Sequence, residues 1–385
     1  MAVSSAEQRS ERTFVVNIEI DYSEVIGKKA ECPEKCGMCC LCQPEVLPEE
    51  RYFFRTNFPK ALVKSKTEDQ HFAVAMKKGA GSCIFLNKRR CDIYQNRPTF
   101  CRQFPYHFYI GDRIRVEMDL SCRGVWSGKG NDAIDEAKIL AERSEKRLIS
   151  EYKEASSVYK EFYSICKEAG VFSDPSILRM SVSENLSKFV DFAFLAKIME
   201  SSLEEPRMAL SNIIPDSNYE IKELEDAARD AAMGSLGSQD PLSVPVYCDE
   251  YWSWNMFMAS ENAIEWAVMD DNGDLHHKGF VDTAEIRLQE PDENGKKVLM
   301  DYISVLNGRD SFLGSVFYTM DQLEYEDDMA NAYYGSLAVT VLDLLWRASL
   351  LNYFMGTGMG AEGIREAIIF YDMDRLDAPT IGAFV

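Results

Sequence analysis

The sequence predicts an α+β fold that joins a small cysteine-rich module to a helical middle region and an α+β C-terminal part. Three observations favour this class. Nine of the eleven cysteines lie between Cys32 and Cys122, residues 131–233 carry apolar side chains at a helical period, and strand-like patterns precede helical ones beyond residue 245. With 385 residues, the chain is long enough for two or three domains. We divide it into a disordered N-terminus (1–13), the cysteine-rich module (14–130), the helical region (131–233), a linker (234–245) and the C-terminal domain (246–385).

The cysteine-rich module is expected to contain little regular structure. Phe14–Ile20 alternates enough to form a strand. A short helix is expected from Pro48, because Pro is favoured in the first turn and two acids follow it near the positive end of the helix dipole. Phe104–Leu120 predicts a hairpin with Gly111-Asp112 at its turn.

The middle region predicts three helices. The first begins at Asn131 or Asp132 and ends near Ala169, because its apolar positions follow a helical period. Ser181-x-x-Glu184 matches a capping box and is expected to open the second helix. The third is expected over Glu220–Met233, before a Gly-, Ser- and Pro-rich stretch that is typical of a linker.

The C-terminal part is expected to begin with a hairpin. Ala263–Val268 and Leu275–Val281 flank Asn272-Gly273, a dipeptide typical of two-residue turns between strands. Two more strands are expected after it, at Val298–Val305 and Ser315–Thr319. Two helices are then expected at Ala330–Asn352 and Ile364–Tyr371.

Composition limits the function classes. The formal net charge of −21 argues against nonspecific binding to nucleic acid or to anionic membranes, so a protein substrate or a basic protein partner is the expected partner class. The most apolar stretch, Leu337–Phe354, is interrupted by Asp343 and Arg347, which favours a buried helix over a membrane span. The N-terminal residues lack the apolar core of a secretory signal, so we expect a cytoplasmic location.

The first cysteine group contains overlapping spacings typical of metal or cluster ligands. In a reducing compartment, clustered cysteines favour metal binding over disulfides. Cys36-x2-Cys39-x2-Cys42 is a ferredoxin-like run, whereas Cys32-x3-Cys36-x2-Cys39 has the spacing used by radical S-adenosylmethionine enzymes. Because successive side chains in an extended chain point apart, the adjacent Cys39 and Cys40 serve different centres, or only one of them is a ligand.

The second cysteine group, read together with the first, resembles a known family. Cys83-Ile-Phe-Leu, Cys91-(x9)-Cys101-Arg-Gln-Phe-Pro and Cys122-Arg-Gly-Val accompany Cys-Gly-Met-Cys-Cys and Leu47-Pro-Glu-Glu. The combination resembles the YkgJ cysteine-cluster family, a zinc- or iron-chelating domain, over residues 32–128. The resemblance implies that the ligands are Cys36, Cys39, Cys40, Cys83, Cys91, Cys101 and Cys122, with Cys32 as the eighth.

Two departures from the family pattern concern the first group. The gap between Cys32 and Cys36 is three residues, where the family more often has two, and Cys42 lies outside the pattern. Cys166 and Cys248 are expected to be isolated and buried.

The identity of the metal is open between iron and zinc. A set of cysteines alone suits both tetrahedral zinc and a [4Fe–4S] cluster. Because the chain has only four histidines, we favour one or two [4Fe–4S] clusters over zinc. Arg97 and Arg102 flank Cys101 closely, and we expect them either to hydrogen-bond cluster sulfides or an anionic ligand, or to pair with local acids.

Three functions are compatible with these observations. The first is an iron–sulfur or metal-binding protein whose centre has a redox, structural or docking role. The second is a protein-modifying enzyme that uses S-adenosylmethionine, because the module is distantly similar to that of flagellin lysine N-methylase, a protein lysine N-methyltransferase. The third is a zinc-binding structural or interaction protein. A radical S-adenosylmethionine enzyme is disfavoured, because the repeating strand–helix pattern of its barrel is missing.

Overall fold

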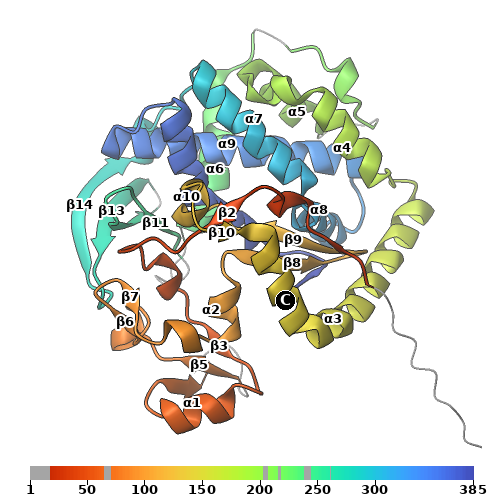
Figure 1. Cartoon of the computed structure of the whole chain (residues 1–385). Coiled ribbons are helices and arrows are strands. Elements are labelled where there is room, and N and C mark those ends of the chain that lie inside the picture. The colour runs from red at the N-terminus through yellow and green to blue at the C-terminus, as the bar shows by residue number, and fades with distance from the viewer. Residues whose placement is uncertain (1–17, 65–70, 203–206, 216–217, 238–243, 261) are drawn as a thin grey trace, which may run out of the picture.

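The structure is a computed structural model that describes residues 18–64, 71–202, 207–215, 218–237, 244–260 and 262–385. Helices and several small sheets are mixed in it, which confirms the predicted α+β class (Figure 1). The expected disorder of residues 1–13 and most of the expected strand at 14–20 lie outside the described residues, and only Ile20 of that strand is seen in β1 (Ile20–Asp21).

A long helix, α9 (Met329–Met355), forms the centre of the larger part of the molecule (Figure 1). It packs most extensively against α5 (Phe192–Ser202), α6 (Ile221–Leu236), α8 (Asp310–Gln322) and α10 (Ala361–Leu376). By length and composition α9 could cross a membrane, but 78% of its most apolar window is buried inside the protein. Its surroundings are those of a core helix, as the sequence predicts.

One sheet brings the two ends of the described chain together. Its strand order is β1–β9–β8–β15, where β8 (Tyr106–Ile110) and β9 (Ile114–Met118) form the predicted hairpin and β15 is Ala383–Phe384. Helix α3 (Ala133–Ala169) packs on this hairpin and ends at Gly170, whose φ of 78° suits the left-handed C-cap that glycine favours.

A second antiparallel sheet has the order β11–β12–β13–β14. Strands β13 (Ala263–Met269) and β14 (Leu275–Asp282) form the hairpin predicted around Asn272-Gly273, and Gly273 has a φ of 87°. Strands β12 (Trp254–Ala259) and β11 (Val246–Cys248) continue the sheet towards the cysteine module.

The cysteine module extends from the rest of the molecule and is drawn in red to orange in Figure 1. Apart from β8 and β9, which belong to the first sheet, its strands are only two or three residues long. They are β2 (Lys29–Ala30), which pairs with β10 (Asn131–Asp132), then β3 (Glu45–Val46), β4 (Leu62–Lys64) and β5 (Phe72–Val74), and the pair β6 (Leu86–Asn87) and β7 (Arg90–Cys91). Two short helices, α1 (Arg51–Asn57) and α2 (Thr99–Gln103), complete it, so the helix expected at Pro48 begins three residues later.

The two strands predicted at Val298–Val305 and Ser315–Thr319 are wrong. These segments are α7 (Glu293–Gly308) and α8. Asp292 caps α7, because its carboxylate accepts hydrogen bonds from the amides of Asn294 and Gly295. The buried positions of α7 recur at helical spacing, so burial on one face overrides the strand preference of its β-branched residues.

The capping box predicted at Ser181 is also wrong. Ser181 lies inside α4 (Pro175–Glu184), and the next α-helix, α5, begins at Phe192. The start signal of α4 is Asp174-Pro175, where the Asp174 carboxylate accepts the Ser176 amide at 2.8 Å and Pro occupies the first helical position. The third predicted helix is confirmed by α6, which continues three residues into the predicted linker; residues 238–243 of that linker lie outside the described residues.

A buried ionic cluster fixes the end of β9, just before Cys122. The Arg309 guanidinium, fully buried, binds Glu24 Oε1 at 3.0 Å and Asp372 Oδ1 at 2.7 Å, and donates to the Met118 carbonyl at 2.7 Å. Asp372 in turn accepts the Leu120 amide at 2.7 Å. The strand that leads to Cys122 is therefore anchored by charges from three distant segments.

Replacing Glu117 with glutamine is expected to weaken the pH dependence of stability. Burial, followed by the charge of Glu24, raises the pKa of Glu117 from 4.5 to about 7. Because the folded state keeps a proton that the unfolded state releases, the stability that is complete below pH 4.5 is lost as the pH rises to 7. Between pH 5 and pH 8, wild type should therefore lose about 1–3 kcal/mol more of its free energy of unfolding than E117Q does. Urea unfolding of both proteins at both pH values measures this difference. Equal pH dependence of the two proteins would contradict this.

Candidate metal centre

Nine cysteines line one cavity of about 910 Å³. They come from separate segments. Five lie in the loop around the short 3₁₀ turn Met38–Cys40, and the others lie in the turn at Cys83, on strand β7, on helix α2 and just before the 3₁₀ turn Arg123–Trp126. All eight predicted ligands are among them, and Cys42 is the ninth. The residues that line this cavity include no histidine.

Backbone hydrogen bonds bring the two cysteine groups together. Gly37 adopts a φ of 63°, and its carbonyl accepts the Cys40 amide at 3.0 Å, which closes the turn that carries Cys39 and Cys40. The Cys40 carbonyl then accepts the Cys83 amide at 2.7 Å. Residues more than forty positions apart are thus held at one edge of the cavity.

Cys39 lies at the centre of the thiols. Its charge acts on those of Cys32, Cys40, Cys42, Cys83, Cys91, Cys101 and Cys122. The Cys40 thiol donates a hydrogen bond to Cys39, and this bond lowers the pKa of Cys39. Burial raises the pKa of Cys83 to about 11, and neighbouring thiols add to the effect. A cationic metal would relieve this crowding of negative charge.

Electrostatic influence among the other thiols forms two overlapping sets. In one, Cys83 and Cys91 act on Cys40 and Cys101. In the other, Cys36 acts on Cys32 and Cys122. The sets overlap because Cys91 also acts on Cys32, and Cys39 acts on members of both.

The two predicted arginines differ in their surroundings. Arg97 lines the cavity, its cation lies 3.8 Å from the centre of the Tyr94 ring, and its charge acts on Cys32, Cys39, Cys91 and Cys101. Arg102 also lines the cavity, but its guanidinium binds Glu50 Oε1 at 3.0 Å and the Thr99 hydroxyl at 3.2 Å. Arg97 Nε donates to the Tyr94 carbonyl at 2.9 Å, which holds its cation at the cavity wall, whereas Arg102 fastens α2 to the segment before α1.

The donors fit a thiophilic metal, because the cavity gathers thiols and no imidazoles. Within the described part of the chain, no three His, Cys, Asp or Glu side chains are already arranged as a ligand set for one ion.

Cys248 is the functional candidate that sequence reasoning missed. It is buried, as predicted, but it is not isolated: its Sγ lies 3.9 Å from the Sγ of Cys36. The two residues are 212 positions apart, and no local spacing in the sequence links them. Cys166, by contrast, is buried in the main core on α3.

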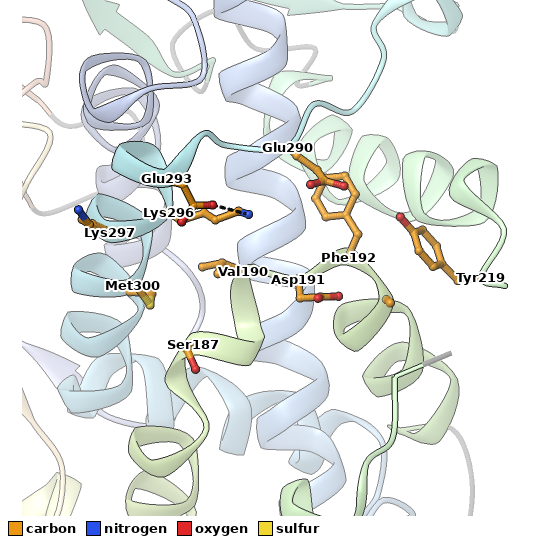
Figure 2. Close-up of a pocket in the computed structure, with 11 residues that line it drawn as sticks. Ser187, Val190, Asp191, Phe192, Tyr219, Glu290, Glu293, Lys296, Lys297 and Met300 are labelled. Carbon is orange, nitrogen blue, oxygen red and sulfur yellow. Dashed lines mark hydrogen bonds and ion pairs between the residues drawn. The ribbon is translucent and has the colours of Figure 1, made fainter. Parts of the chain in front are cut away.

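A second hollow, of about 520 Å³, lies between the segment Ser187–Ala193 and α7 (Figure 2). Its walls carry both charges, and Lys296 pairs with Glu293 at 3.1 Å. None of the predicted site residues lines it.

Comparison with known proteins agrees with the geometry of the cysteine module. Residues 31–123 match the CxxCxxCC family, described as "Putative zinc- or iron-chelating domain". This confirms the predicted cysteine-cluster family for that segment, and the similarity to flagellin lysine N-methylase stays a prediction. The chelating domain holds all eight predicted ligands and both arginines, whereas Cys248 lies beyond it.

One curated relative matches part of the chain. An uncharacterized protein of Methanocaldococcus jannaschii is 28% identical over 106 residues, which are 25% of this chain and 58% of that protein. This chain thus spans a little over half the length of the relative. No solved structure matches the chain.

Proposed function

We propose that this protein is a cytoplasmic iron–sulfur protein whose chelating domain holds a [4Fe–4S] cluster with a redox, structural or docking role towards a protein partner. The observation that supports it is the convergence of nine thiols, and no histidine, on one cavity. Cys40, Cys83, Cys91 and Cys101 are the four ligands that we assign to the cluster.

Two features of the cavity favour a cluster over a single zinc ion at these four positions. A volume of about 910 Å³ leaves room for a polynuclear centre. The charge of Arg97 acts on two of the assigned ligands, Cys91 and Cys101, and charges and hydrogen bonds near cluster sulfurs set the reduction potential.

Replacing Cys101 with serine is expected to remove most of the cluster, because one of its four thiolates is lost. Anaerobically purified wild type is expected to be brown and to contain about four iron and four sulfide per cluster, whereas C101S should lose at least about half of both. The measurement is iron and acid-labile sulfide per chain. Cys166→Ser is the matched control, because Cys166 is buried in the main core and should keep full content. Colourless wild type with stoichiometric zinc would reject the cluster.

A further inference from the structure

Cys36 and Cys248 form a buried thiol pair between the chelating domain and the C-terminal sheet. Their sulfurs are 3.9 Å apart, and both residues are less than one-tenth exposed. Cys248 is the last residue of β11, the edge strand of its sheet.

Each cysteine of this pair is held by a hydrogen bond to its backbone carbonyl. The Trp254 indole, on β12, donates to the Cys36 carbonyl at 2.9 Å, and the Arg123 guanidinium donates to the Cys248 carbonyl. Arg123 directly follows Cys122 and also binds Glu366 of α10. The side chains of Trp254 and Arg123 therefore tie the backbone at Cys36 and Cys248 to neighbouring segments.

The hairpin turn of the sheet docks closely on the chelating domain next to the pair. Ser82 donates its hydroxyl to the Asp271 carbonyl at 2.8 Å, and Arg89 binds the Asp271 carboxylate at 3.1 Å. A Cβ on Gly81 would lie 2.3 Å from the carbonyl carbon of Asn272, so only glycine allows this approach. The sheet that carries Cys248 is therefore packed closely on the chelating domain at Gly81 and Ser82.

We propose that Cys248 is a metal ligand and that it shares one tetrahedral ion, zinc or iron, with Cys36. This inference rests on the proposed function, because Cys36 lines the cavity of the proposed cluster, whereas Cys248 contacts Cys36 and does not itself line the cavity. With metal–sulfur bonds of about 2.3 Å, two thiolates of one tetrahedral ion are about 3.8 Å apart, which agrees with the 3.9 Å found here. In a [4Fe–4S] cluster each thiolate binds a different iron, so the pair would be farther apart.

Cys32 and Cys122 complete the set of four. The Cys36 thiol acts electrostatically on both of them, and both line the cavity. Binding of a divalent ion by these four residues releases the proton of each thiol that binds. The ion then links the chelating domain to the C-terminal sheet, and the four cysteines assigned to the cluster stay available.

The test compares Cys248→Ser and Cys248→Ala with wild type and with Cys166→Ser, all as full chains purified anaerobically. We expect the Cys248 variants to lose about one zinc or iron ion per chain while acid-labile sulfide is unchanged. Unchanged metal content in both variants would overturn the inference, as would a Cys36–Cys248 disulfide in metal-loaded wild type, detected by mass spectrometry under non-reducing conditions. Wild type without any metal would instead reject the proposed function.

A second readout separates ligation from simple packing. A ligand stabilises the folded state only when metal is bound, so wild type and Cys248→Ala should unfold at similar temperatures without metal and differ by several degrees with it. An equal difference with and without metal would show that Cys248 only fills space, and would overturn the inference.

Discussion

Replacing Arg309 with methionine is expected to lower the free energy of unfolding by about 3–5 kcal/mol, measured by urea unfolding of the metal-loaded protein. Arg309 is fully buried and binds the Glu24 and Asp372 carboxylates. Methionine fills a similar volume but leaves two buried carboxylates and the Met118 carbonyl without their partner. The cost arises from these stranded groups more than from the lost attraction.

Arg287→Met is the matched control for this substitution. Arg287 binds Glu225 at 3.1 Å, but its side chain is 72% exposed, so water replaces the lost partner. We expect a loss of less than about 1 kcal/mol. A loss for R309M as small as that for R287M would show that the buried cluster contributes little. Asp372→Asn combined with R309M should recover part of the loss, because it removes one of the stranded charges.

The sequence predicts well those elements whose signals are local. The Asn272-Gly273 turn, the β8–β9 hairpin and the long helix after Asp132 are all present, because turn residues, alternation and helical period act within a few residues. The failures at α7 and α8 have the opposite origin. In these segments the β-branched residues favour strands locally, but packing against the other helices stabilises the helical conformation instead.

The site residues also differ in whether a local sequence signal points to them. That the eight predicted ligands line one cavity could be expected, because their short spacings and the family pattern lie within one stretch of sequence. Cys248 could not be predicted, since it reaches Cys36 only through the docking of the hairpin turn on Gly81 and Ser82. The distance between the two sulfurs is a property of that contact, and the sequence holds no pattern for it.

Removing the metal is expected to loosen the chelating domain while the helical core stays folded. In hydrogen–deuterium exchange, we expect amides of residues 71–101 to exchange at least about a thousandfold faster after chelation under reducing conditions, which corresponds to a local loss of about 4 kcal/mol. Amides in α9 should keep their protection, because most of that helix is buried among other helices.

The small size of the domain's own core is the physical reason. Five buried residues form its main cluster, namely Val46, Phe54, Val74, Cys83 and Ile93, and one of them is itself a predicted ligand. Strands of two or three residues supply few backbone hydrogen bonds. Small units of this kind depend on metals or disulfides, and the described cysteines form no disulfides.

The experiment distinguishes a structural metal from one that is only carried. If the metal were cargo, chelation would leave exchange in 71–101 unchanged, and this outcome would contradict the prediction. Cys101→Ser provides a second route to the same state without a chelator and should give a similar exchange pattern. Outside the domain, amides of the hairpin turn at Asn272-Gly273 should also exchange faster, because this turn packs on Gly81 and should lose its protection together with it.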